Sequence, residues 1–583
     1  MDLIPQIVIL DAGGQYCHLI ARKVRELGIY AEVRSSETPV GELVGARGII
    51  ISGGPSSVYD PGSPTVDPGI FATGQPVLGI CYGQQLMAHH LGGEVSQGHK
   101  GEYGLATLKI DAAGDPLFAD LPGRQRVWMN HRDTVVSPPS GFSIAGSTAT
   151  CAVAAMAAPR RKLYGLQFHP EVAHTEHGRE YLSNFVFRVC GCQKDWDPRH
   201  RVAMLEQEIR ECAGARNVFF FVSGGVDSSV AFALTTRALG PDRVRGVYVD
   251  TGLMREGETE AIASMPGLTI ERAEEQFLSA LAGVTDPEQK RHIIGEEFVR
   301  VQERIIESRH LLDEHWILGQ GTIYPDTIES GGTAKAAVIK THHNRVAGIQ
   351  KLIECGLILE PLKSFYKDEV REVGRELGLP DELLERHPFP GPGLAIRCLC
   401  SEFDAPVRAT REGFILPVNS VGVQGDARSY APVLAIESTG DLEIDIGNSQ
   451  DVIGIPGVNR IVAAVQLRCP LAAMEVQACS LTRERIALAR RADAIVRWLS
   501  RESHFDREVW QFPVILIPAG AAQSPESIVL RPINSVDGMT ARPVVMDEKV
   551  LLKRMCAELL QIDEIAAVFY DLTNKPPGTI EWE

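Results

Sequence analysis

The segment FFFVSGGVDSS at residues 219–229 decides the fold of the middle of this chain. Its four apolar residues at 219–222 predict a buried strand, and the sequence after the Ser-Gly-Gly turn predicts a helix over 228–239. Consecutive backbone N–H groups in such a turn, together with the helix N-terminus, form a binding site for phosphate. The segment is not a Walker A loop, because Gly-Lys-Ser/Thr is absent from it. Asp227 is a candidate Mg²⁺ ligand, since a hard cation that bridges phosphates prefers carboxylate oxygen.

Outward from this segment, short apolar runs alternate with helical patterns as far as about residue 380, which is typical of parallel α/β architecture. The predicted strands are 7–10, 48–51, 77–80 and 163–168 in the first part of the chain and 217–222, 244–249 and 316–318 in the second. Further helices are predicted over 287–308 and 367–377. The polar segment GCQKDWDPRHR at 191–201 interrupts the alternation and indicates a linker.

After about residue 395 the pattern changes to shorter strands with one or two helices, and a weak internal repeat is present. The similar pairs are 414–418 (FILPV) with 514–518 (VILIP), 432–438 with 527–534, and 460–467 with 566–572. Chance similarity between α+β segments is the alternative to duplication. We therefore expect an α/β protein with two parallel-sheet α/β domains followed by a duplicated α+β domain. The predicted domains are 1–192, 202–395 and 396–583, the last in copies of about 396–480 and 481–583.

Composition and charge exclude several classes of protein. The chain has 583 residues, of which 44% are hydrophobic and 23% charged, enough for three or four domains with cores of their own. Lys and Arg number 58 against 75 for Asp and Glu, giving a net charge of −17. Proteins that bind nucleic acid normally carry a basic excess, so we expect no nucleic-acid partner. An anionic substrate would need a local basic pocket.

The compartment is predicted from three further features. No stretch approaches the roughly 18 consecutive apolar residues of a transmembrane helix, so we expect no membrane partner. The N-terminal MDLIPQIVILDAGG lacks the basic lead and cleavage site of a signal peptide. The 12 cysteines are scattered, without a CxxC pair typical of a zinc or dithiol site. We expect a reduced, cytoplasmic protein.

A second group of residues with catalytic character lies in the first part of the chain. In VLGICYGQQ, Cys81 follows an apolar strand with the Gly-x-Cys-x-Gly spacing of a nucleophile elbow, and a helix N-terminus there favours its thiolate. In QFHPE, His169 is the candidate base and Glu171 the group that orients it. The N–H groups of Gly53 and Tyr82 are candidates for an oxyanion hole. Together these residues predict acyl transfer through a thioester; the alternative is a buried structural cysteine and a loop histidine.

Nucleotide-binding candidates lie in and around the glycine turn. They are Ser223, Gly224, Gly225, Val226, Asp227, Ser228, Ser229 and, at the end of the next strand, Asp250. The stretch GQGTIYPD at 319–326 follows another strand and is a further candidate. Lys335 and Lys340 lie in a polar stretch, which is either a solvated loop or a lid that neutralises leaving pyrophosphate. Lys363 is a candidate for the same role, or a surface lysine.

The motifs GICYGQQ, ISGGPSS and GLQFHPE resemble those of class I glutamine amidotransferases, and the resemblance covers about residues 5–190. It implies that Cys81 hydrolyses glutamine to glutamate and releases ammonia. It also implies that Gln85, Asn130 and His131 help to shape the glutamine pocket.

The SGGVDSS turn resembles the loop of ATP pyrophosphatases, which cleave ATP between the α- and β-phosphates and adenylate an oxygen. An ammonia generator joined to an adenylating domain implies ATP-driven amination of a carbonyl oxygen. The motifs PFPGPGL, VGVQGDARSY and KPPGTIEWE at 388–394, 421–430 and 575–583 resemble those of glutamine-hydrolysing GMP synthetases, a resemblance that extends over essentially the whole chain.

That resemblance implies a C–N ligase of guanine nucleotide biosynthesis with glutamine, ATP and XMP as substrates and Mg²⁺ as the cofactor bound with ATP. The C2 oxygen of XMP would be adenylated with release of pyrophosphate, and ammonia would displace AMP to give GMP. The XMP site implied by the resemblance contains Arg291, Asp426, Gln511, Lys575 and Glu581. Lys575 and Arg291 suit a phosphate, whereas Asp426 and Glu581 suit ribose hydroxyls or base N–H groups.

The tail departs from the short form of the family, in which VGV-x-GD and KPP-x-TIEWE occur in one dimerisation domain. Here the two motifs fall in different copies, as in the long form typical of eukaryotes. Our hypothesis is that the second copy of this dimerisation-type domain replaces a subunit contact with an internal pseudo-symmetric pair, so a monomer or a homodimer is expected.

Four rival functions are weaker. A CTP synthetase would carry its synthetase part first and a Walker-type loop, and a glutamine-dependent NAD synthetase would use a different glutaminase. A tRNA-modifying pyrophosphatase would need a basic surface. A scaffold or nucleotide sensor that kept the fold should have lost Cys81, His169 or the SGGVDSS loop, and all are intact.

Overall fold

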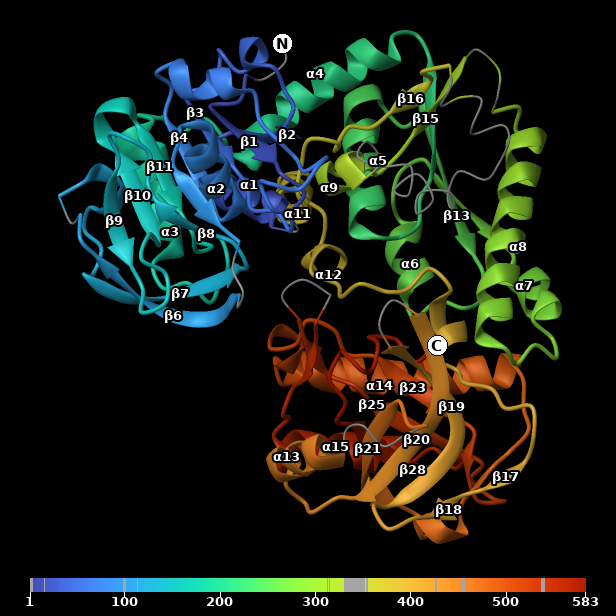
Figure 1. Cartoon of the computed structure of the whole chain (residues 1–583). Helices are drawn as coiled ribbons and strands as arrows, with labels where there is room; N and C mark the ends of the chain where they lie inside the picture. The colour runs from blue at the N-terminus through green and yellow to red at the C-terminus, as the bar shows by residue number, and fades with distance from the viewer. Residues whose placement is uncertain are drawn as a thin grey trace. The chain divides into compact units, whose positions relative to one another are not determined.

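The computed structural model describes residues 4–14, 16–97, 101–112, 114–311, 313, 315–329, 352, 355–424, 427–452, 457–535 and 540–583. These residues form two compact units, Met1–Pro198 and Arg199–Glu583. Figure 1 draws the first unit in blue to blue-green and the second in green to red. Within the described ranges, no helix combines the length and the apolar character needed to cross a membrane.

The first unit contains a nine-stranded sheet with the order β2-β1-β3-β4-β11-β10-β9-β6-β7. Its first five strands are parallel, and the remaining strands continue the sheet in antiparallel fashion. The strands are β1 (Ile7–Asp11), β2 (Ala31–Ser35), β3 (Gly48–Ile51), β4 (Val77–Ile80), β6 (Glu102–Ile110), β7 (Arg124–His131), β9 (Ser143–Ser147), β10 (Ala155–Ala158) and β11 (Leu163–Leu166). A separate pair joins β5 (Glu94–Ser96) to β8 (Thr134–Ser137), and the helices are α1 (Cys17–Glu26), α2 (Tyr82–His90) and α3 (Gly178–Ser183).

The four strands predicted for this unit are confirmed as β1, β3, β4 and β11. All residues of β3, β4 and β11 are buried, which is why these strands are continuous apolar runs in the sequence. The antiparallel extension was not predicted. Its longest strand, β6, alternates between exposed and less exposed residues along most of its length, so no continuous apolar run marks it.

The second unit opens with a parallel five-stranded sheet of order β14-β13-β12-β15-β16. The strands are β12 (Asn217–Phe221), β13 (Val244–Asp250), β14 (Leu268–Arg272), β15 (Trp316–Gly319) and β16 (Ile358–Leu359). The helices include α4 (Val202–Ala213), α5 (Val226–Leu239), α6 (Glu258–Ala263), α7 (Glu274–Ala280), α8 (Pro287–Ser308), α9 (Tyr324–Glu329), α11 (Lys367–Glu376) and α12 (Asp381–Leu384). The chain order reverses on either side of β12, so the loops after β12 and β15 meet where open α/β sheets bind ligands.

The tail is built on a seven-stranded sheet with the order β18-β19-β20-β21-β28-β25-β23. Its strands are β18 (Arg408–Ala409), β19 (Phe414–Gln424), β20 (Ala427–Glu437), β21 (Arg460–Leu467), β23 (Val514–Ile517), β25 (Glu526–Leu530) and β28 (Ile565–Asp571). The helices packed with them are α13 (Leu442–Val452), α14 (Arg483–Glu502) and α15 (Lys553–Leu559). A small sheet joins β17 (Ala405–Pro406), β22 (Glu475–Val476) and β24 (Ala519–Gly520).

Apart from the edge strand β18, the pairing directions in this sheet are the same when read outward from its central pair on either side. The central pair β21·β28 is antiparallel, each is parallel to its outer neighbour, β20 or β25, and each of those is antiparallel to β19 or β23. Strands β19, β20 and β21 hold the first member of each similar sequence pair, and β23, β25 and β28 hold the second. The sheet is therefore a pseudo-symmetric pair of β-β-α-β copies within one chain.

Alternation along these strands explains how both faces of the sheet are covered. Leu434, Ile461 and Val568 pack with α14 and α15 in one apolar cluster. Their sequence neighbours Val433, Val462 and Phe569 belong to a second cluster, which includes the small sheet and Trp582. Successive side chains of a strand point to opposite faces, so a sheet packed on both sides needs apolar residues at consecutive positions.

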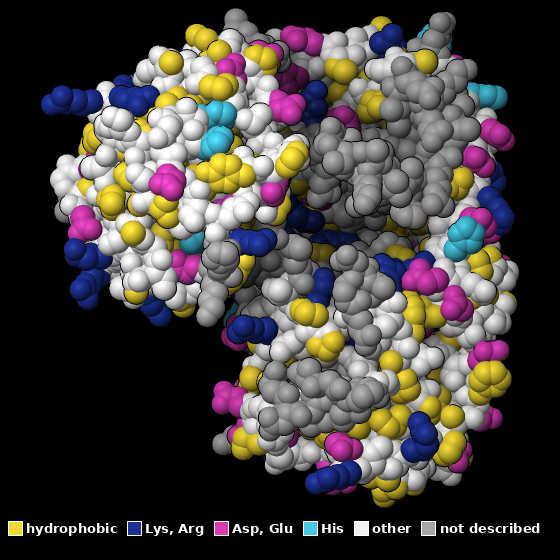
Figure 2. Space-filling model, viewed as in Figure 1, with side chains coloured by type: hydrophobic (Ala, Val, Ile, Leu, Met, Phe, Trp, Pro, Cys, Tyr) yellow, Lys and Arg dark blue, Asp and Glu magenta, His cyan; other side chains and the backbone are white. Residues whose placement is uncertain are grey.

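The charged surface contains both signs of charge. On the face seen in Figure 2, Lys and Arg side chains are interspersed with Asp and Glu side chains. Basic groups therefore lie among acidic ones on this face, although the chain as a whole carries a net charge of −17. An anionic substrate must then depend on the cations of its own site.

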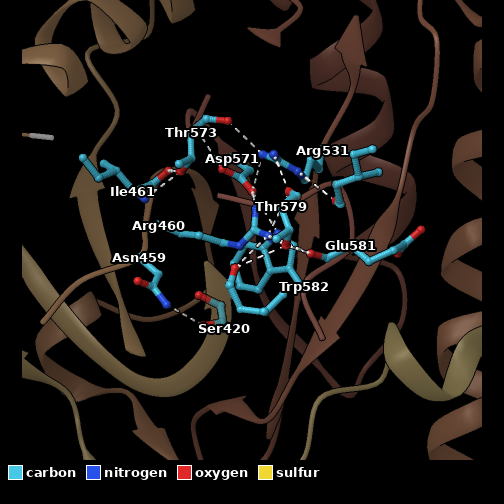
Figure 3. Close-up of polar contacts among 12 residues, drawn as sticks. Ser420, Asn459, Arg460, Ile461, Arg531, Asp571, Thr573, Thr579, Glu581 and Trp582 are labelled. Carbon is cyan, nitrogen blue, oxygen red and sulfur yellow. Dashed lines mark hydrogen bonds and ion pairs between the residues drawn. The ribbon is translucent and has the colours of Figure 1, made fainter. Parts of the chain in front are cut away.

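A buried ionic network ties the last residues of the chain to the centre of the tail sheet. Asp571 lies between two guanidinium groups in Figure 3, with its Oδ2 atom 3.0 Å from Arg460 and 2.7 Å from Arg531. Trp582 donates its indole N–H to the same oxygen at 2.8 Å. Arg460 also donates to the carbonyl oxygens of Thr579 and Glu581. The network therefore fixes the KPPGTIEWE segment on β21 and β28.

We expect Asp571→Asn to destabilise the protein strongly, because it leaves Arg460 and Arg531 fully buried without their carboxylate. Breaking a buried pair costs about 3–5 kcal/mol. Urea denaturation followed by far-UV circular dichroism would show a lower midpoint. The matched control is Glu502→Gln, which breaks an exposed pair with Arg554 and should cost about 1 kcal/mol or less. Equal midpoints for the two variants would contradict the assigned role of Asp571.

Candidate active site

Cys81 lies at the turn between β4 and α2, where its backbone has φ 52° and ψ −105°. A positive φ is uncommon for a residue with a side chain and is typical of a strained nucleophile elbow. Close packing requires the flanking glycines. A Cβ on Gly79 would lie 2.4 Å from the carbonyl oxygen of Gly83, and a Cβ on Gly83 would lie 2.4 Å from that of Ile51. The Gly-x-Cys-x-Gly spacing therefore has a steric cause.

His169 follows β11 and forms a buried pair with Glu171, whose Oε1 atom lies 2.7 Å from Nδ1 of the imidazole. Burial alone would lower the pKa of His169, but the negative charges of Glu171 and the Cys81 sulfur raise it well above its usual value. Among the described residues, Nε2 of His169 has no hydrogen-bond partner. That nitrogen is therefore available to exchange a proton with Cys81.

A cavity of about 730 Å³ opens at this end of the parallel strands. Cys81 and His169 both line it, as do the sequence-predicted residues Gln85, Asn130 and His131. A cavity of this size accommodates a small polar substrate such as an amino-acid amide. The structure thus gathers six of the eight predicted residues of the first unit around one cavity, whereas Glu171 and Tyr82 do not line it.

The two candidate oxyanion donors lie beside the nucleophile. A Cβ on Gly53 would lie 3.0 Å from Cε1 of His169 and 3.5 Å from Cβ of Cys81, so the SGGP loop touches both residues. Tyr82 is the first residue of α2, and an N–H group at that position has no acceptor within its helix. Both N–H groups are therefore suited to an oxyanion formed at Cys81.

The Asn130–Asp133 loop is held against the elbow by hydrogen bonds. Gln85 donates its side-chain N–H to the carbonyl oxygen of Asp133 at 2.7 Å, which joins α2 to this loop. The Cys81 thiol lies 3.6 Å from the carbonyl oxygen of Asn130. The imidazole of His131 is buried, with Nδ1 3.0 Å from the carbonyl oxygen of Asp133.

Two residues near the nucleophile were not predicted. Gln167 places its side-chain nitrogen 3.7 Å from the Cys81 sulfur, and the ring of Tyr16 meets that of His169 edge-on at 5.3 Å. Gln167 directly follows β11 and lies two residues before His169 in the QFHPE motif, so its place in that motif is the signal that could have found it. No motif marks Tyr16 in the sequence. The only indication of a role was its position in a loop after a strand, where functional residues are common.

We expect Glu171→Gln to slow glutamine hydrolysis by roughly 10²-fold or more, since the imidazole loses the group that orients it. The substitution removes the negative charge that raises the pKa of His169, so the imidazolium should lose its proton at a lower pH. The alkaline limb of the kcat/KM profile for glutamine should therefore move to lower pH. A profile measured for both proteins checks this, and an unchanged alkaline limb would rule out the assigned role.

The glycine turn after β12 has the conformation expected of a phosphate cradle. Gly224 has φ 75°, which favours glycine, and Ser223 accepts a hydrogen bond from the N–H of Gly225 at 3.2 Å. The hydroxyl oxygens of Ser223 and Ser228 lie 2.9 Å apart. A Cβ on Gly321 would lie 2.7 Å from the backbone of Ser228, so the GQG loop after β15 packs against the first turn of α5. The structure thus joins two predicted loops.

The other predicted residues of this region have different surroundings. Val226 and Ser229 are buried within the first turn of α5. Asp250 accepts hydrogen bonds from the N–H of Gly252 and the hydroxyl of Thr259, so its carboxylate orders the loop after β13. Lys363 is exposed. Lys335, Lys340 and Asp426 lie outside the described residues.

The surroundings of Asp227 fit a divalent cation. Its Oδ1 atom is buried and has no hydrogen-bond partner among the described residues. Burial raises the pKa of Asp227, and Asp326, at the other loop, raises it further against the opposing effect of Lys367. Lys367, whose Nζ lies 3.6 Å from Oδ2 of Asp227, was not predicted, because a lysine at the start of a helix carries no motif. Asp326 is close enough to affect Asp227 electrostatically, and carboxylate oxygens are the ligands that Mg²⁺ prefers.

The residues assigned by resemblance to XMP fall into two groups. Arg291 donates to the backbone oxygen of Glu583, and Glu581 accepts two hydrogen bonds from Arg397 at 2.9 and 2.7 Å, so both lie where the C-terminal segment meets α8 and the PFPGPGL region. Gln511 and Lys575 lie in two other backbone bridges, Gln511 with Ile533 and Lys575 with Ala541. Arg397 was not predicted, although it lies three residues after the PFPGPGL stretch.

The VGV and KPPGTIEWE motifs, which the sequence places in different copies, meet in the structure. Val423 donates its N–H to the carbonyl oxygen of Pro577 at 2.8 Å, and Val421 donates to that of Trp582 at 2.9 Å. Gly422 and Gly578 form an antiparallel bridge between these contacts. The second copy thus returns its last residues to the first copy.

Comparisons with known proteins agree with this organisation. The chain matches the family models of glutamine amidotransferase class-I over residues 8–189, NAD synthase over 198–301 and the GMP synthase C terminal domain over 500–582. It is 42% identical to the "Probable GMP synthase (glutamine-hydrolyzing)" of Leptospira interrogans, over 99% of both chains. It is 40% identical to the GMP synthase (glutamine-hydrolyzing) of Thermobifida fusca, over 99% of this chain and 98% of that one.

Among solved structures, a glutamine amidotransferase from Thermotoga maritima covers 33% of this chain and 100% of its own, with 19% identity and a TM-score of 0.27.

The cysteine elbow with its His-Glu pair, on a sheet matched by the amidotransferase model, defines a class I glutamine amidotransferase unit joined to a second α/β unit. Since full-length relatives share about 40% identity, the chain belongs to the family of glutamine-hydrolysing GMP synthases.

Proposed function

We propose that the protein converts XMP to GMP with ATP and with ammonia released from glutamine. The observation that carries this proposal is the presence, in one chain of this family, of two sets of candidate groups. One is the Cys81–His169–Glu171 set on the first unit, and the other is the glycine turn with Asp227 and Asp326 on the second.

In the first half-reaction, Cys81 attacks the side-chain amide carbon of glutamine after its thiol proton passes to His169. His169 then gives the proton to the departing ammonia, and the acyl group stays on the sulfur as a thioester that water hydrolyses to glutamate. Glu171 holds the imidazole through Nδ1. The N–H groups of Gly53 and Tyr82 stabilise the negative oxygen in both steps.

In the second half-reaction, the backbone N–H groups of the 223–229 turn bind the phosphates of ATP. Mg²⁺ would be held by Asp227 and Asp326, and when bound it supplies positive charge that offsets the phosphate charge. Lys367 adds a cation at the same place. The C2 oxygen of XMP attacks the α-phosphorus and pyrophosphate leaves; ammonia then attacks C2 and AMP leaves with that oxygen.

For XMP itself, we propose that Arg291 and Lys575 receive the phosphate and that Gln511, whose Oε1 atom is buried without a partner among the described residues, accepts from the base or ribose. Glu581 acts through Arg397, which donates hydrogen bonds to both oxygens of its carboxylate. We place the enzyme in the cytoplasm, where its nucleotide substrates occur and its cysteines stay reduced. Both a monomer and a homodimer are compatible with the fold, because the two copies within the chain already form a contact like the one that joins subunits in a dimerisation domain.

The test is pyrophosphate release from ATP, measured with XMP and compared with UTP, deamido-NAD and tRNA as acceptors. Only XMP should support release, with AMP and GMP as the other products. Release with deamido-NAD in place of XMP would contradict the proposal and favour the NAD synthase relationship of residues 198–301.

A further inference from the structure

Three metal-ligand side chains lie together beside the glutaminase cavity: Glu102, His131 and Cys151. Glu102 begins β6 and pairs directly with His131, which ends β7, while Cys151 lies in the loop between β9 and β10. Their ligand atoms all lie within 4.8 Å of one another. Cys151 is 1% exposed, and the side chains of His131 and Glu102 are 5% and 18% exposed.

Both hydrogen-bond contacts of the His131 imidazole could be satisfied together only if the ring were positively charged. Nδ1 lies 3.0 Å from the carbonyl oxygen of Asp133, and Nε2 lies 3.3 Å from Oε2 of Glu102, so both ring nitrogens face oxygen acceptors. A neutral imidazole carries one N–H and can satisfy only one of them. A cation bound at Nε2 would remove the contact between two acceptors.

The surrounding groups orient all three side chains. The Asp133 carbonyl is positioned to accept from Nδ1–H, which directs the Nε2 lone pair toward Glu102. Glu102 accepts from the hydroxyls of Thr148 and Thr150, and the Cys151 sulfur lies 3.3 Å from the hydroxyl of Thr134. Metal-binding histidines commonly donate their second ring nitrogen to a carbonyl, and metal-binding carboxylates are commonly hydrogen-bonded in the same way.

We propose that Glu102, His131 and Cys151 form a binding site for a divalent metal ion of the zinc type. One imidazole nitrogen, one thiolate and one carboxylate are the donors that Zn²⁺ prefers, and three protein ligands leave its fourth position for water. Magnesium is disfavoured, because it selects oxygen ligands alone. On binding, the Cys151 thiol releases its proton to solvent and its sulfur bonds to the metal, without oxidation or reduction.

The site lies next to the catalytic groups but is distinct from them. His131 lines the cavity, and its neighbour Asn130 contacts the Cys81 sulfur through its carbonyl oxygen. An ion bound here would tie β6, β7 and the 148–151 turn to the wall of the glutamine pocket. The proposal concerns the first unit alone and does not depend on XMP chemistry.

The test is a Co²⁺ titration of the full-length Cys81→Ala protein, which removes the catalytic thiol as a competing ligand. We expect a thiolate-to-cobalt charge-transfer band that is lost when Zn²⁺ is added in competition. In the Cys81→Ala/Cys151→Ser protein the band should vanish, whereas in the matched control Cys81→Ala/Cys192→Ser it should remain, since Cys192 is another buried cysteine of the same unit. A band that survives in the Cys151→Ser protein, or no band in Cys81→Ala, would overturn the site.

Two checks separate loss of the site from loss of the fold. In Cys151→Ser, the hydroxyl can keep the contact with Thr134. The far-UV circular dichroism spectrum and the rate of ammonia-dependent GMP synthesis should therefore be unchanged. Glu102→Gln keeps the shape of the side chain but not its charge. In the Cys81→Ala background it should weaken Co²⁺ binding by roughly 10-fold or more, since loss of an outer partner of a ligand already costs that much. If the Glu102→Gln protein binds Co²⁺ with unaltered affinity, Glu102 is not a ligand and the proposed site is wrong.

Discussion

Cys81→Ala should abolish glutamine-dependent GMP synthesis and leave ammonia-dependent synthesis near that of the unchanged protein. The thioester cannot form without the sulfur, and loss of a nucleophile costs roughly 10³-fold or more in rate. Added ammonia bypasses this step, because the nucleotide groups lie on a different compact unit of the chain. The measurement is GMP formation with glutamine or with an ammonium salt as the nitrogen source.

The matched control is Cys192→Ala, which removes a buried cysteine of the same unit that does not line the cavity. It should retain activity with both nitrogen sources. Loss of both activities in Cys81→Ala, with the fold intact by circular dichroism, would refute independent sites. Retained glutamine-dependent synthesis would refute Cys81 as the nucleophile.

Asp227→Asn should remove adenylation whichever nitrogen source is supplied. Its carboxylate is the proposed metal ligand at the phosphates, and charge stabilisation of several kcal/mol corresponds to a loss of roughly 10²- to 10³-fold. Pyrophosphate release with saturating XMP and ammonium measures this step without the glutaminase. Near-normal release would contradict the metal role of Asp227.

The stability of Asp227→Asn gives a second, opposite expectation. Burial and Asp326 raise the pKa of Asp227, so its ionised form at neutral pH destabilises the folded state. Removing the charge should therefore leave the urea midpoint unchanged or higher while activity falls. The control Asp242→Asn changes an exposed carboxylate beyond the other end of α5 and should alter neither property. If the urea midpoint of Asp227→Asn is lowered, the loss of activity results from misfolding and does not support the metal role of Asp227.

Local patterns predicted the parallel cores well, for a physical reason. A strand buried on both faces must be apolar throughout, so β3 and β4 were located to the residue from their runs alone. The helix predicted over 287–308 is confirmed as α8, and in the structure Asp286 caps it and Pro287 begins it. Strands with one solvated face, such as β6, alternate in polarity and were missed.

Short motifs also predicted the candidate catalytic residues of the first unit, because the backbone geometry there requires particular residue types. The elbow needs glycine at 79 and 83, since any Cβ at either position would collide with a carbonyl oxygen. The His-x-Glu spacing matters because it places Glu171 against Nδ1 of His169. Such requirements act within a few residues, so they leave a mark in the sequence.

By itself, then, the sequence determined the fold class, the turn that carries Cys81, the glycine turn after β12 and the duplication of the tail. Tertiary structure alone decided which distant groups meet: Lys367 with Asp227, Arg397 with Glu581, and Glu102 and His131 with Cys151. The reason is that such contacts join side chains tens or hundreds of residues apart, and a single charged or polar residue leaves no periodic signal. Only the folded sheets, which set the register between strands, bring these groups within bonding distance.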